Sequence, residues 1–215
     1  MKDPESTTAG LAAALQRALG SEVSGLRRLS GGASQETWMF TAAGERLVLR
    51  RAPGGGRSGG TAASISLAAE AKLLRLAMAA GVPVPSVRCV LAENDGAGFV
   101  MEFVEGETIP RKILRDDTYA KARTGLAAQC GAVLAGIHGI SPTSIPELKP
   151  QQAAAQVAQY RGIYDSLDDP RPVFELAFRW LSDHLPCEST PTVVHGDFRN
   201  GNLIVGPDGL RAVLD

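Results

Sequence analysis

The segment from residue 193 to residue 215 constrains the fold of this chain more than any other feature. It reads VVHGDFRNGNLIVGPDGLRAVLD, so an apolar pair enters a charged loop and a β-rich run then meets Gly206-Pro207-Asp208-Gly209. Glycine, proline and aspartate between two apolar runs are typical of a tight turn, and the segment predicts a β-hairpin. In that hairpin Val205 lies opposite Leu210.

The predicted hairpin brings polar residues of the segment together. A turn centred on Pro207-Asp208 places Asn202 near Val213, because the two strands run antiparallel. Asp215 then emerges beside the loop that carries Asp197 and Asn202. Residues that are separated along the chain thus become neighbours in space.

These side chains suit magnesium and phosphate chemistry. Mg²⁺ prefers oxygen ligands and commonly takes one or two protein groups, with phosphate and water filling the other positions. Asn202 and Asp215 fit that requirement, and Asp197 is left free to accept the proton of an attacking hydroxyl. The alternative interpretation is an ordinary turn, rich in aspartate and asparagine, between two strands.

The spacing His195-x-Asp197-x-x-x-x-Asn202, followed by a hairpin that ends in Asp215, resembles the catalytic and metal-binding loops of the aminoglycoside phosphotransferase family. These enzymes are small-molecule relatives of protein kinases. The form His-Gly-Asp-Phe-Arg-x-Gly-Asn-Leu is particularly similar to kinase-like domains joined to acyl-CoA dehydrogenases. The resemblance implies that Asp197 is the catalytic base, that Asn202 and Asp215 hold Mg²⁺, and that ATP is the cofactor.

The resemblance also implies an α+β fold of the protein-kinase-like, two-lobe type. We expect residues 1–104 to form an N-lobe, which has an antiparallel sheet and one main helix and covers the nucleotide. Residues 105–215 are then a partial, mainly helical C-lobe. Within it, helical patterns cover residues 118–137, 150–167 and 173–185, where alanine and leucine recur at core spacing.

The first predicted hairpin of the N-lobe has small residues at its turn. Strands are expected at residues 26–30 and 35–41, on either side of Gly31, Gly32 and Ser34. Small side chains let backbone amides approach phosphate oxygens, so these three residues are candidates for nucleotide binding. A plain hairpin turn is the alternative.

An arginine stands where a kinase-like lobe carries its phosphate-binding lysine. Arg50 lies near the end of an apolar strand at residues 46–51, and guanidinium also binds phosphate while keeping its charge. By resemblance, Glu70 in a helix at residues 63–80 pairs with Arg50 and orients it. The alternatives are a solvated basic strand end for Arg50, and for Glu70 an exposed carboxylate paired with a cation on its own helix.

A connector between the lobes follows the paired strands predicted at residues 87–91 and 99–104. In kinase-like proteins the backbone of this hinge bonds the edge of adenine, and an apolar strand face packs on the ring. Met101, Glu102 and Val104 are the matching candidates. A structural strand followed by a loop explains the same residues.

Composition excludes some partners. The net charge is −1 and the arginines form no basic stripe interleaved with aromatics, so we expect no nucleic-acid partner. No apolar run approaches the roughly 20 residues that span a bilayer, so we expect no membrane segment. Three widely spaced cysteines and an N-terminus without a secretory signal predict a cytoplasmic location.

The chain stops at the presumed metal ligand Asp215, whereas members of the family continue into a helical region that helps to bind the acceptor. We therefore expect a truncated C-lobe, a further tail, or a homo-oligomer that covers the gap.

The predicted function is ATP-dependent transfer of the γ-phosphate to a hydroxyl of a small molecule, which is a sugar, an aminoglycoside-like, a choline-like or a hydroxyacyl acceptor. The alternative is a non-catalytic, pseudokinase-like nucleotide-binding module, which the arginine at position 50 and the missing C-terminal region favour. A general α+β hydrolase is a third interpretation, and it predicts activity without nucleotide.

Overall fold

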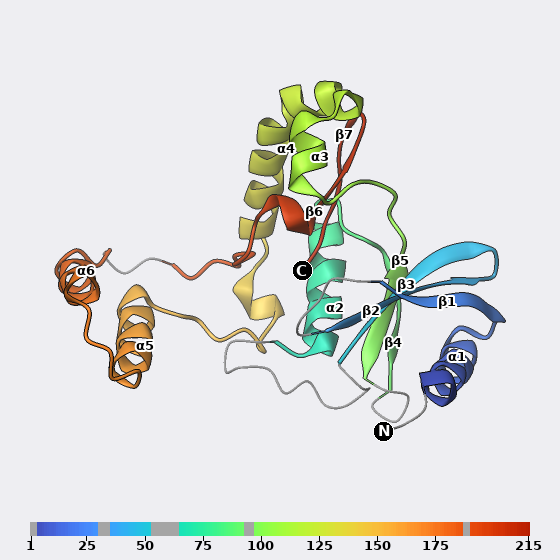
Figure 1. Cartoon of the computed structure of the whole chain (residues 1–215), viewed down its shortest axis with the longest axis horizontal. Coiled ribbons are helices and arrows are strands. Elements are labelled where there is room, and N and C mark those ends of the chain that lie inside the picture. The colour runs from blue at the N-terminus through green and yellow to red at the C-terminus, as the bar shows by residue number, and fades with distance from the viewer. Residues whose placement is uncertain (1–3, 30–34, 53–64, 93–96, 187–189) are drawn as a thin grey trace. The chain divides into compact units, whose positions relative to one another are not determined.

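The computed structural model describes residues 4–29, 35–52, 65–92, 97–186 and 190–215. The chain divides into two compact units (Figure 1): unit 1 comprises residues 1–147 and 193–215, and unit 2 comprises residues 148–192. The predicted lobe boundary at residues 104 and 105 falls inside unit 1 and stays a prediction. Among the helices of the described residues, none combines the length and apolarity needed to cross a membrane.

Unit 1 contains the antiparallel sheet that the sequence predicts, in the strand order β1-β2-β3-β5-β4. The predicted pairing of the strands at residues 87–91 and 99–104 is confirmed, and the turn that the sequence Asn94-Asp95-Gly96 indicates between them lies outside the described residues. The strands are β1 (Val23–Leu29), β2 (Glu36–Ala42), β3 (Glu45–Arg51), β4 (Val87–Leu91) and β5 (Gly98–Glu102).

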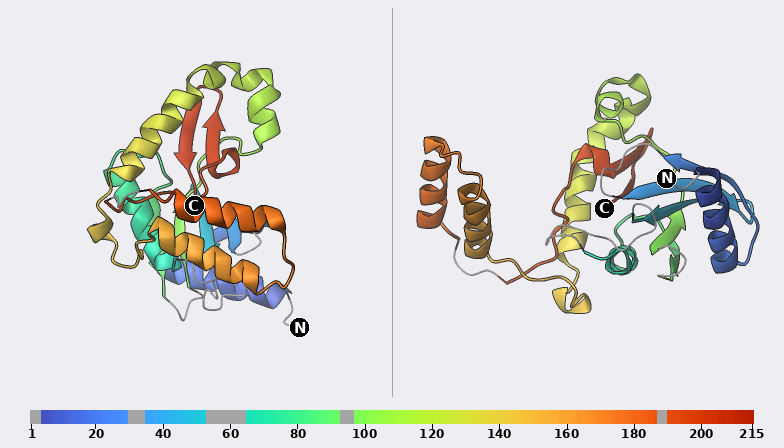
Figure 2. Two further views of the ribbon diagram at one scale, coloured as in Figure 1. Left: turned by 90° about the vertical axis from the view of Figure 1, so that its left-hand side faces the viewer. Right: turned by 60° about the horizontal axis from the view of Figure 1, so that its bottom comes forward.

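Two helices lie on opposite sides of this sheet (Figure 2), α1 (Pro4–Leu19) and α2 (Leu67–Ala79). Side chains alternate between the two faces of a strand, so each strand supplies both faces. The face toward α1 holds a buried cluster that includes Leu15 and Phe40. The predicted helix at residues 63–80 is confirmed as α2, which begins after Ser66, whose Oγ accepts a hydrogen bond from the N–H of Ala69 at 3.2 Å.

The remainder of unit 1 follows β5 and carries the predicted hairpin. The helix expected at residues 118–137 is confirmed as α4, and the turn of the hairpin is centred on Pro207-Asp208, with Val205 opposite Leu210 as predicted. Gln129 of α4 anchors the hairpin, because its Oε1 accepts the N–H of Leu210 at 2.8 Å. The elements are α3 (Pro110–Arg115), η3 (Asp117–Tyr119), α4 (Ala120–His138), η4 (Pro142–Ser144), η5 (Asn200–Asn202), β6 (Leu203–Gly206) and β7 (Gly209–Val213).

Unit 2 is a pair of helices, α5 (Ala153–Asp165) and α6 (Pro172–Asp183), which confirm the helices predicted there. The pair is joined by an edge-on contact between the rings of Tyr164 and Phe174, 5.7 Å apart, and by an ion pair between Arg161 and Glu175. Several large apolar side chains of this unit are exposed, among them those of Leu176 and Trp180.

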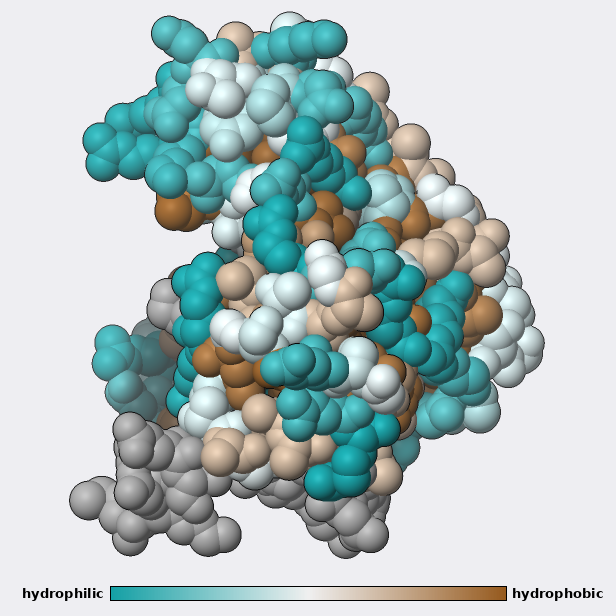
Figure 3. All heavy atoms as spheres, turned by 90° about the vertical axis from the view of Figure 1, so that its right-hand side faces the viewer, coloured by the Kyte–Doolittle hydropathy of each residue, from teal (hydrophilic) through white to brown (hydrophobic). Residues whose placement is uncertain are grey.

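On the side shown in Figure 3, hydrophobic residues form small separate groups among hydrophilic ones. That pattern is the ordinary one for a protein surface, because single apolar side chains are common there.

Candidate active site

Strand β3 sends two neighbouring arginines to opposite faces of the sheet. Arg51 lies toward Glu36, with 3.2 Å between Nε and Oε2. Arg50 faces the other way, toward α2, where its Nε lies 2.8 Å from Oε1 of Glu70. The ion pair implied by the resemblance is therefore present, and Arg50, with 18% of its side chain exposed, is not a solvated strand end.

The guanidinium of Arg50 joins three segments of unit 1. Besides Glu70, it donates hydrogen bonds to Oε1 of Gln35 and to Oδ1 of Asp215. Burial raises the pKa of Glu70, and the positive charge of Arg50 opposes that rise. Our sequence interpretation gave Gln35 no role; its place immediately before a strand that pairs with the one carrying Arg50 was the available signal.

The predicted catalytic loop begins with a glycine in a left-handed conformation. Gly196 has φ of +82°, which side chains with a Cβ atom disfavour, and it lets the chain turn between His195 and Asp197. His195 Nε2 donates to the carbonyl of Leu214 at 2.9 Å, while its Nδ1 accepts the N–H of Asp197 at 3.3 Å. One neutral tautomer satisfies both bonds, so His195 braces the loop against the end of the hairpin.

Asn202 is buried and is oriented by Asp197. Its Nδ2 donates to the backbone carbonyl of Asp197 at 2.9 Å and to Oδ2 of the same residue at 3.0 Å. Because both amide hydrogens are engaged there, Oδ1 is the atom of Asn202 left for another partner. The carbonyl of Asn202 accepts the N–H of Leu214 at 2.8 Å, which places Asp215 one residue beyond this contact, as the hairpin register predicts.

Asp197 also forms an ion pair with an arginine of its own loop. Arg199 Nε lies 3.1 Å from Oδ1 and 2.9 Å from Oδ2 of Asp197. The hydrogen bond from Arg199 is the main reason that the pKa of Asp197 lies below its ordinary value, and Asn202 adds to the effect. The side chain of Arg199 is 63% exposed, so it meets solvent while it holds Asp197.

The donor set suits Mg²⁺ better than a softer metal. Among the described residues, no group of three histidine, cysteine, aspartate or glutamate side chains gathers into a metal cluster. Asn202 and Asp215 instead offer an amide oxygen and a carboxylate, and such a pair of hard oxygen donors is what Mg²⁺ commonly takes from a protein. The chemistry of these residues therefore fits the predicted ion.

The hinge lies between β5 and the catalytic hairpin. Met101 pairs with Val48 across the sheet and shares the face of Arg50. The N–H of Glu102 donates to Ser86 O at 3.0 Å, whereas among the described residues no backbone hydrogen bond uses Val104. Within the described part of the chain, the backbone groups of Val104 therefore have no backbone partner. Gly31, Gly32 and Ser34 lie outside the described residues.

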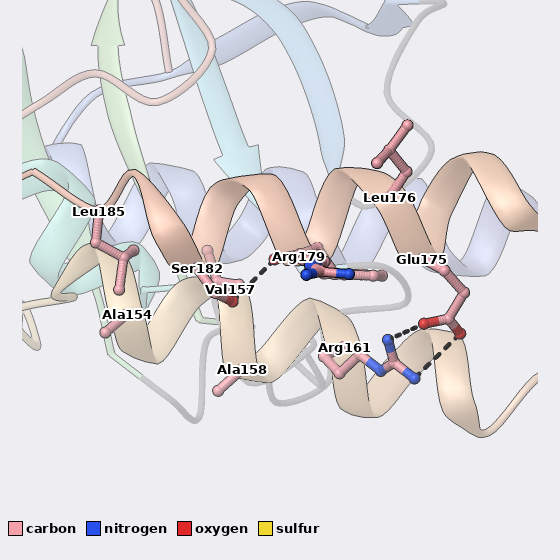
Figure 4. Close-up of a pocket in the computed structure, with 10 residues that line it drawn as sticks. Ala154, Val157, Ala158, Arg161, Glu175, Leu176, Arg179, Ser182 and Leu185 are labelled. Carbon is pink, nitrogen blue, oxygen red and sulfur yellow. Dashed lines mark hydrogen bonds and ion pairs between the residues drawn. The ribbon is translucent and has the colours of Figure 1, made fainter.

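A groove of about 780 Å³ lies between the two helices of unit 2, and none of its lining residues is one predicted for the site. Figure 4 shows Arg161 and Glu175 facing one another near one end of the groove and Ala154 and Leu185 near the other. Apolar side chains of the facing helices line it together with the charged Arg161, Glu175 and Arg179, as expected where two helices pack side by side near the surface. All the candidate site residues that the structure describes belong to unit 1.

Comparison with known proteins shows the family of this chain. The model of the phosphotransferase enzyme family, APH, matches residues 25–215. The chain belongs to the phosphotransferase enzyme family. Acyl-CoA dehydrogenase family member 10 of Mus musculus is 30% identical to this family member over 203 residues, which are 88% of this chain and 18% of the mouse protein. The resemblance drawn from the catalytic loop is confirmed.

Solved structures of phosphotransferases share the fold of this family member. The crystal structure of aminoglycoside phosphotransferase APH(4)-Ia matches it with a TM-score of 0.66 at 17% identity, over 96% of this chain and 70% of that one. The GDP complex of aminoglycoside 2′-phosphotransferase-IIIa matches with a TM-score of 0.66 at 18% identity, over 90% of this chain and 67% of that one. The α+β, kinase-like fold predicted from the sequence is confirmed. The chain spans less than a fifth of the mouse relative.

Proposed function

We propose that the protein transfers the γ-phosphate of ATP to a hydroxyl group of a small molecule. The observation that carries the proposal is the meeting, within unit 1, of one cation and the catalytic hairpin: Arg50 binds Asp215, and Asn202 binds Asp197. In a member of a phosphotransferase family, a phosphate-binding cation, two oxygen donors and a base are the parts that such a transfer needs.

Arg50 is proposed to hold the nucleotide phosphates. Glu70 keeps its guanidinium in place from the side of α2, and Gln35 does so from the position immediately before β2. A planar guanidinium has five N–H donors, so Arg50 retains donors for phosphate oxygens while Glu70 binds Nε. Phosphate replaces Asp215 as a partner of Arg50, which releases the carboxylate.

Asn202 Oδ1 and the released Asp215 carboxylate are proposed to hold Mg²⁺, which, when bound, neutralises charge on the phosphates. Asp197 receives the acceptor hydroxyl. Its Oδ1 accepts only the longer branch of the hydrogen bond from Arg199, so this oxygen is the better placed to take the hydroxyl proton. Positioning and charge neutralisation then supply most of the catalysis.

The hinge is proposed to bind the base of the nucleotide. The backbone groups of Val104, which make no backbone hydrogen bond to any described residue, are suited to the edge of adenine, and Met101, on the face that carries Arg50, is suited to packing against the ring. Glu102 contributes its backbone at the end of β5. The small residues Gly31, Gly32 and Ser34 are proposed to contact phosphate oxygens.

The acceptor class is open to direct screening. Sugars, aminoglycosides, choline-like alcohols and hydroxyacyl compounds all carry the hydroxyl that Asp197 needs. Incubation of the protein with ATP, with GTP and with each acceptor, followed by detection of the phosphorylated product, identifies both substrates. The cytoplasmic location and a homo-oligomeric state stay predictions; cell fractionation and light scattering test them.

The first test is Asp197→Asn. The amide keeps the shape of the side chain but cannot accept the hydroxyl proton, so kcat is expected to fall by about 10²- to 10⁴-fold. Binding of Mg²⁺ and nucleotide, measured by isothermal titration, is expected to persist.

Asp208→Asn is the matched control, because Asp208 lies at the exposed turn of the same hairpin and its contact with Arg211 is long, at 3.4 Å. It should leave kcat unchanged. Undiminished turnover in Asp197→Asn would refute the role of base.

The second candidate function is a non-catalytic, pseudokinase-like nucleotide-binding module. The arginine at position 50 favours it, because guanidinium and ammonium present charge to phosphate with different geometry. Titration with ATP and Mg²⁺, followed by an ATP hydrolysis assay and the acceptor screen, separates the two functions. Binding without any turnover supports the module.

A further inference from the structure

The carboxylate of Asp197 is held on two sides. Asn202 Nδ2 donates to Oδ2 at 3.0 Å, and Nε of Arg199 reaches both oxygens, at 3.1 Å and 2.9 Å. A carboxylate with one donor is free to rotate about its last bond, whereas donors from two directions define its plane. Arg199 therefore has the geometry to orient the oxygen that faces the acceptor.

A glycine makes this contact of Arg199 possible. A Cβ atom at position 201 would overlap with Nη1 of Arg199 and lie 3.4 Å from its Cζ. The backbone of Gly201 is in the 3₁₀ turn η5 and its φ is not positive, so alanine fits the backbone there. The overlap is with the far end of a flexible side chain, and moving that side chain away from Asp197 is the easiest way to relieve it.

The pair contributes little to the stability of the fold. Both side chains are mostly exposed, and exposed ion pairs typically add only about 0–1 kcal/mol. Arg199 contacts the predicted base and adds little to the stability of the fold. Its contact is therefore better explained by an effect on the orientation of the Asp197 carboxylate.

We propose that Arg199 is a positioning residue that fixes the orientation of the Asp197 carboxylate, and that Gly201 provides the space in which its guanidinium lies. This inference rests on the proposed phosphotransferase function. Arg199 acts on the transfer step through Asp197, so its loss lowers kcat and leaves the binding of nucleotide intact. The residue also has to keep its contact with Asp197, and its charge alone does not suffice.

Two substitutions test the two halves of the proposal. Arg199→Gln removes the guanidinium, and Gly201→Ala keeps it but displaces it from Asp197. Both are expected to lower kcat by about 10- to 100-fold, since misplacing a reacting group by an ångström costs up to about 100-fold. The KM for nucleotide is expected to stay within about twofold of the wild-type value, because neither substitution changes a residue that is proposed to bind the nucleotide.

Gly131→Ala is the matched control for Gly201→Ala. Gly131 lies in α4, and a Cβ atom added there meets nothing within 4 Å. The control should keep the wild-type kcat. Arg199→Lys, which retains the charge on a single nitrogen, is expected to recover part of the kcat that Arg199→Gln loses.

Three results would overturn the proposal. They are wild-type kcat in Arg199→Gln, wild-type kcat in Gly201→Ala alongside an impaired Arg199→Gln, and a loss that appears in the nucleotide KM. The second result would show that the charge of Arg199 acts elsewhere.

A readout without turnover separates this proposal from the proposed function. The Nε–H proton of Arg199, observed by NMR, is expected to show slow exchange with water in the wild-type protein and fast exchange in Gly201→Ala. Absence of transfer to every acceptor would refute the function, while this signal would still report the contact. Equal exchange in the two proteins would refute the contact.

Discussion

Arg50 shows how one residue ties distant segments together. Its guanidinium contacts Gln35 before β2, Glu70 in α2 and Asp215 after β7. Glu70 is nearly buried, and a buried carboxylate is costly unless a cation accompanies it. The sheet half and the catalytic hairpin of unit 1 are therefore linked by charge at the place proposed for phosphate.

Arg50→Met is expected to destabilise unit 1 in a pH-dependent way. Burial raises the pKa of Glu70 above its ordinary 4.5, and Arg50 limits the rise. A carboxyl with a raised pKa favours folding while protonated, and this advantage is lost as the pH climbs from the ordinary value through the raised one. Without Arg50 the raised pKa moves further up, so the variant should lose about 1–3 kcal/mol at pH 8 and less at pH 5.

Urea unfolding of wild type and variant at the two pH values measures this difference. Arg50→Met combined with Glu70→Gln is the control, because the amide has no charge to bury. The double variant should lose the extra pH dependence. An equal loss of stability at both pH values in Arg50→Met would contradict the account.

At the scale of elements, the proposed hinge after β5 and the hairpin are joined by hydrogen bonds. Glu107 and Val205 exchange backbone hydrogen bonds of 2.9 Å and 3.0 Å, so the chain after β5 forms a single β-bridge with β6. Arg211 of β7 also donates to the carbonyl of Glu105 at 3.0 Å. These bonds hold the segment after β5, the proposed hinge, against the hairpin proposed to bind metal.

Gly106→Ala is expected to disturb that junction. A Cβ atom at position 106 would lie 2.5 Å from Cγ2 of Ile204 and 2.9 Å from the carbonyl oxygen of Val205. Backbone has to move to relieve the second contact, and overpacking of this kind costs about 1–3 kcal/mol. Thermal unfolding measures the loss, and nucleotide affinity should fall with it. Gly125→Ala, where the nearest atom lies 3.8 Å away, should cost nothing.

At the scale of the whole chain, the large apolar side chains differ in burial between the two units. Phe40 is completely buried in the core of unit 1, whereas Leu176 of α6 is 68% exposed although α6 is strongly amphipathic. A large exposed apolar set marks a surface rather than a core. The stability of the chain therefore depends on unit 1.

Phe40→Ala and Leu176→Ala should differ accordingly. Loss of the buried ring is expected to cost about 3–5 kcal/mol, through lost burial and the cavity left behind. Loss of the exposed leucine should change stability by no more than about 0.5 kcal/mol. Denaturant titration of each variant measures the two values, and similar losses would show that Leu176 is buried in solution.

Much of the fold could be predicted from the sequence, because strands, helices and turns leave patterns among neighbouring residues. Alternation of apolar and polar residues marked the strands, and the turn at Pro207-Asp208 set the register of the hairpin. Helix α1 was missed, although Leu11, Ala14 and Leu15 recur at helical spacing on its buried side. Short-range periodicity and turn chemistry are properties of neighbouring residues, so the chain itself determines them.

The partners of individual side chains were decided by tertiary structure. The spacing of Asp197 and Asn202 was visible in the chain, but the contact between Arg50 and Asp215, 165 residues apart, depends on how the sheet meets the hairpin. The hold of Arg199 on Asp197 likewise depends on the space left by Gly201. The sequence by itself determined which groups the protein carries and in which elements. Packing alone decided which of them touch, because a side-chain contact needs a position in three dimensions that no local pattern encodes.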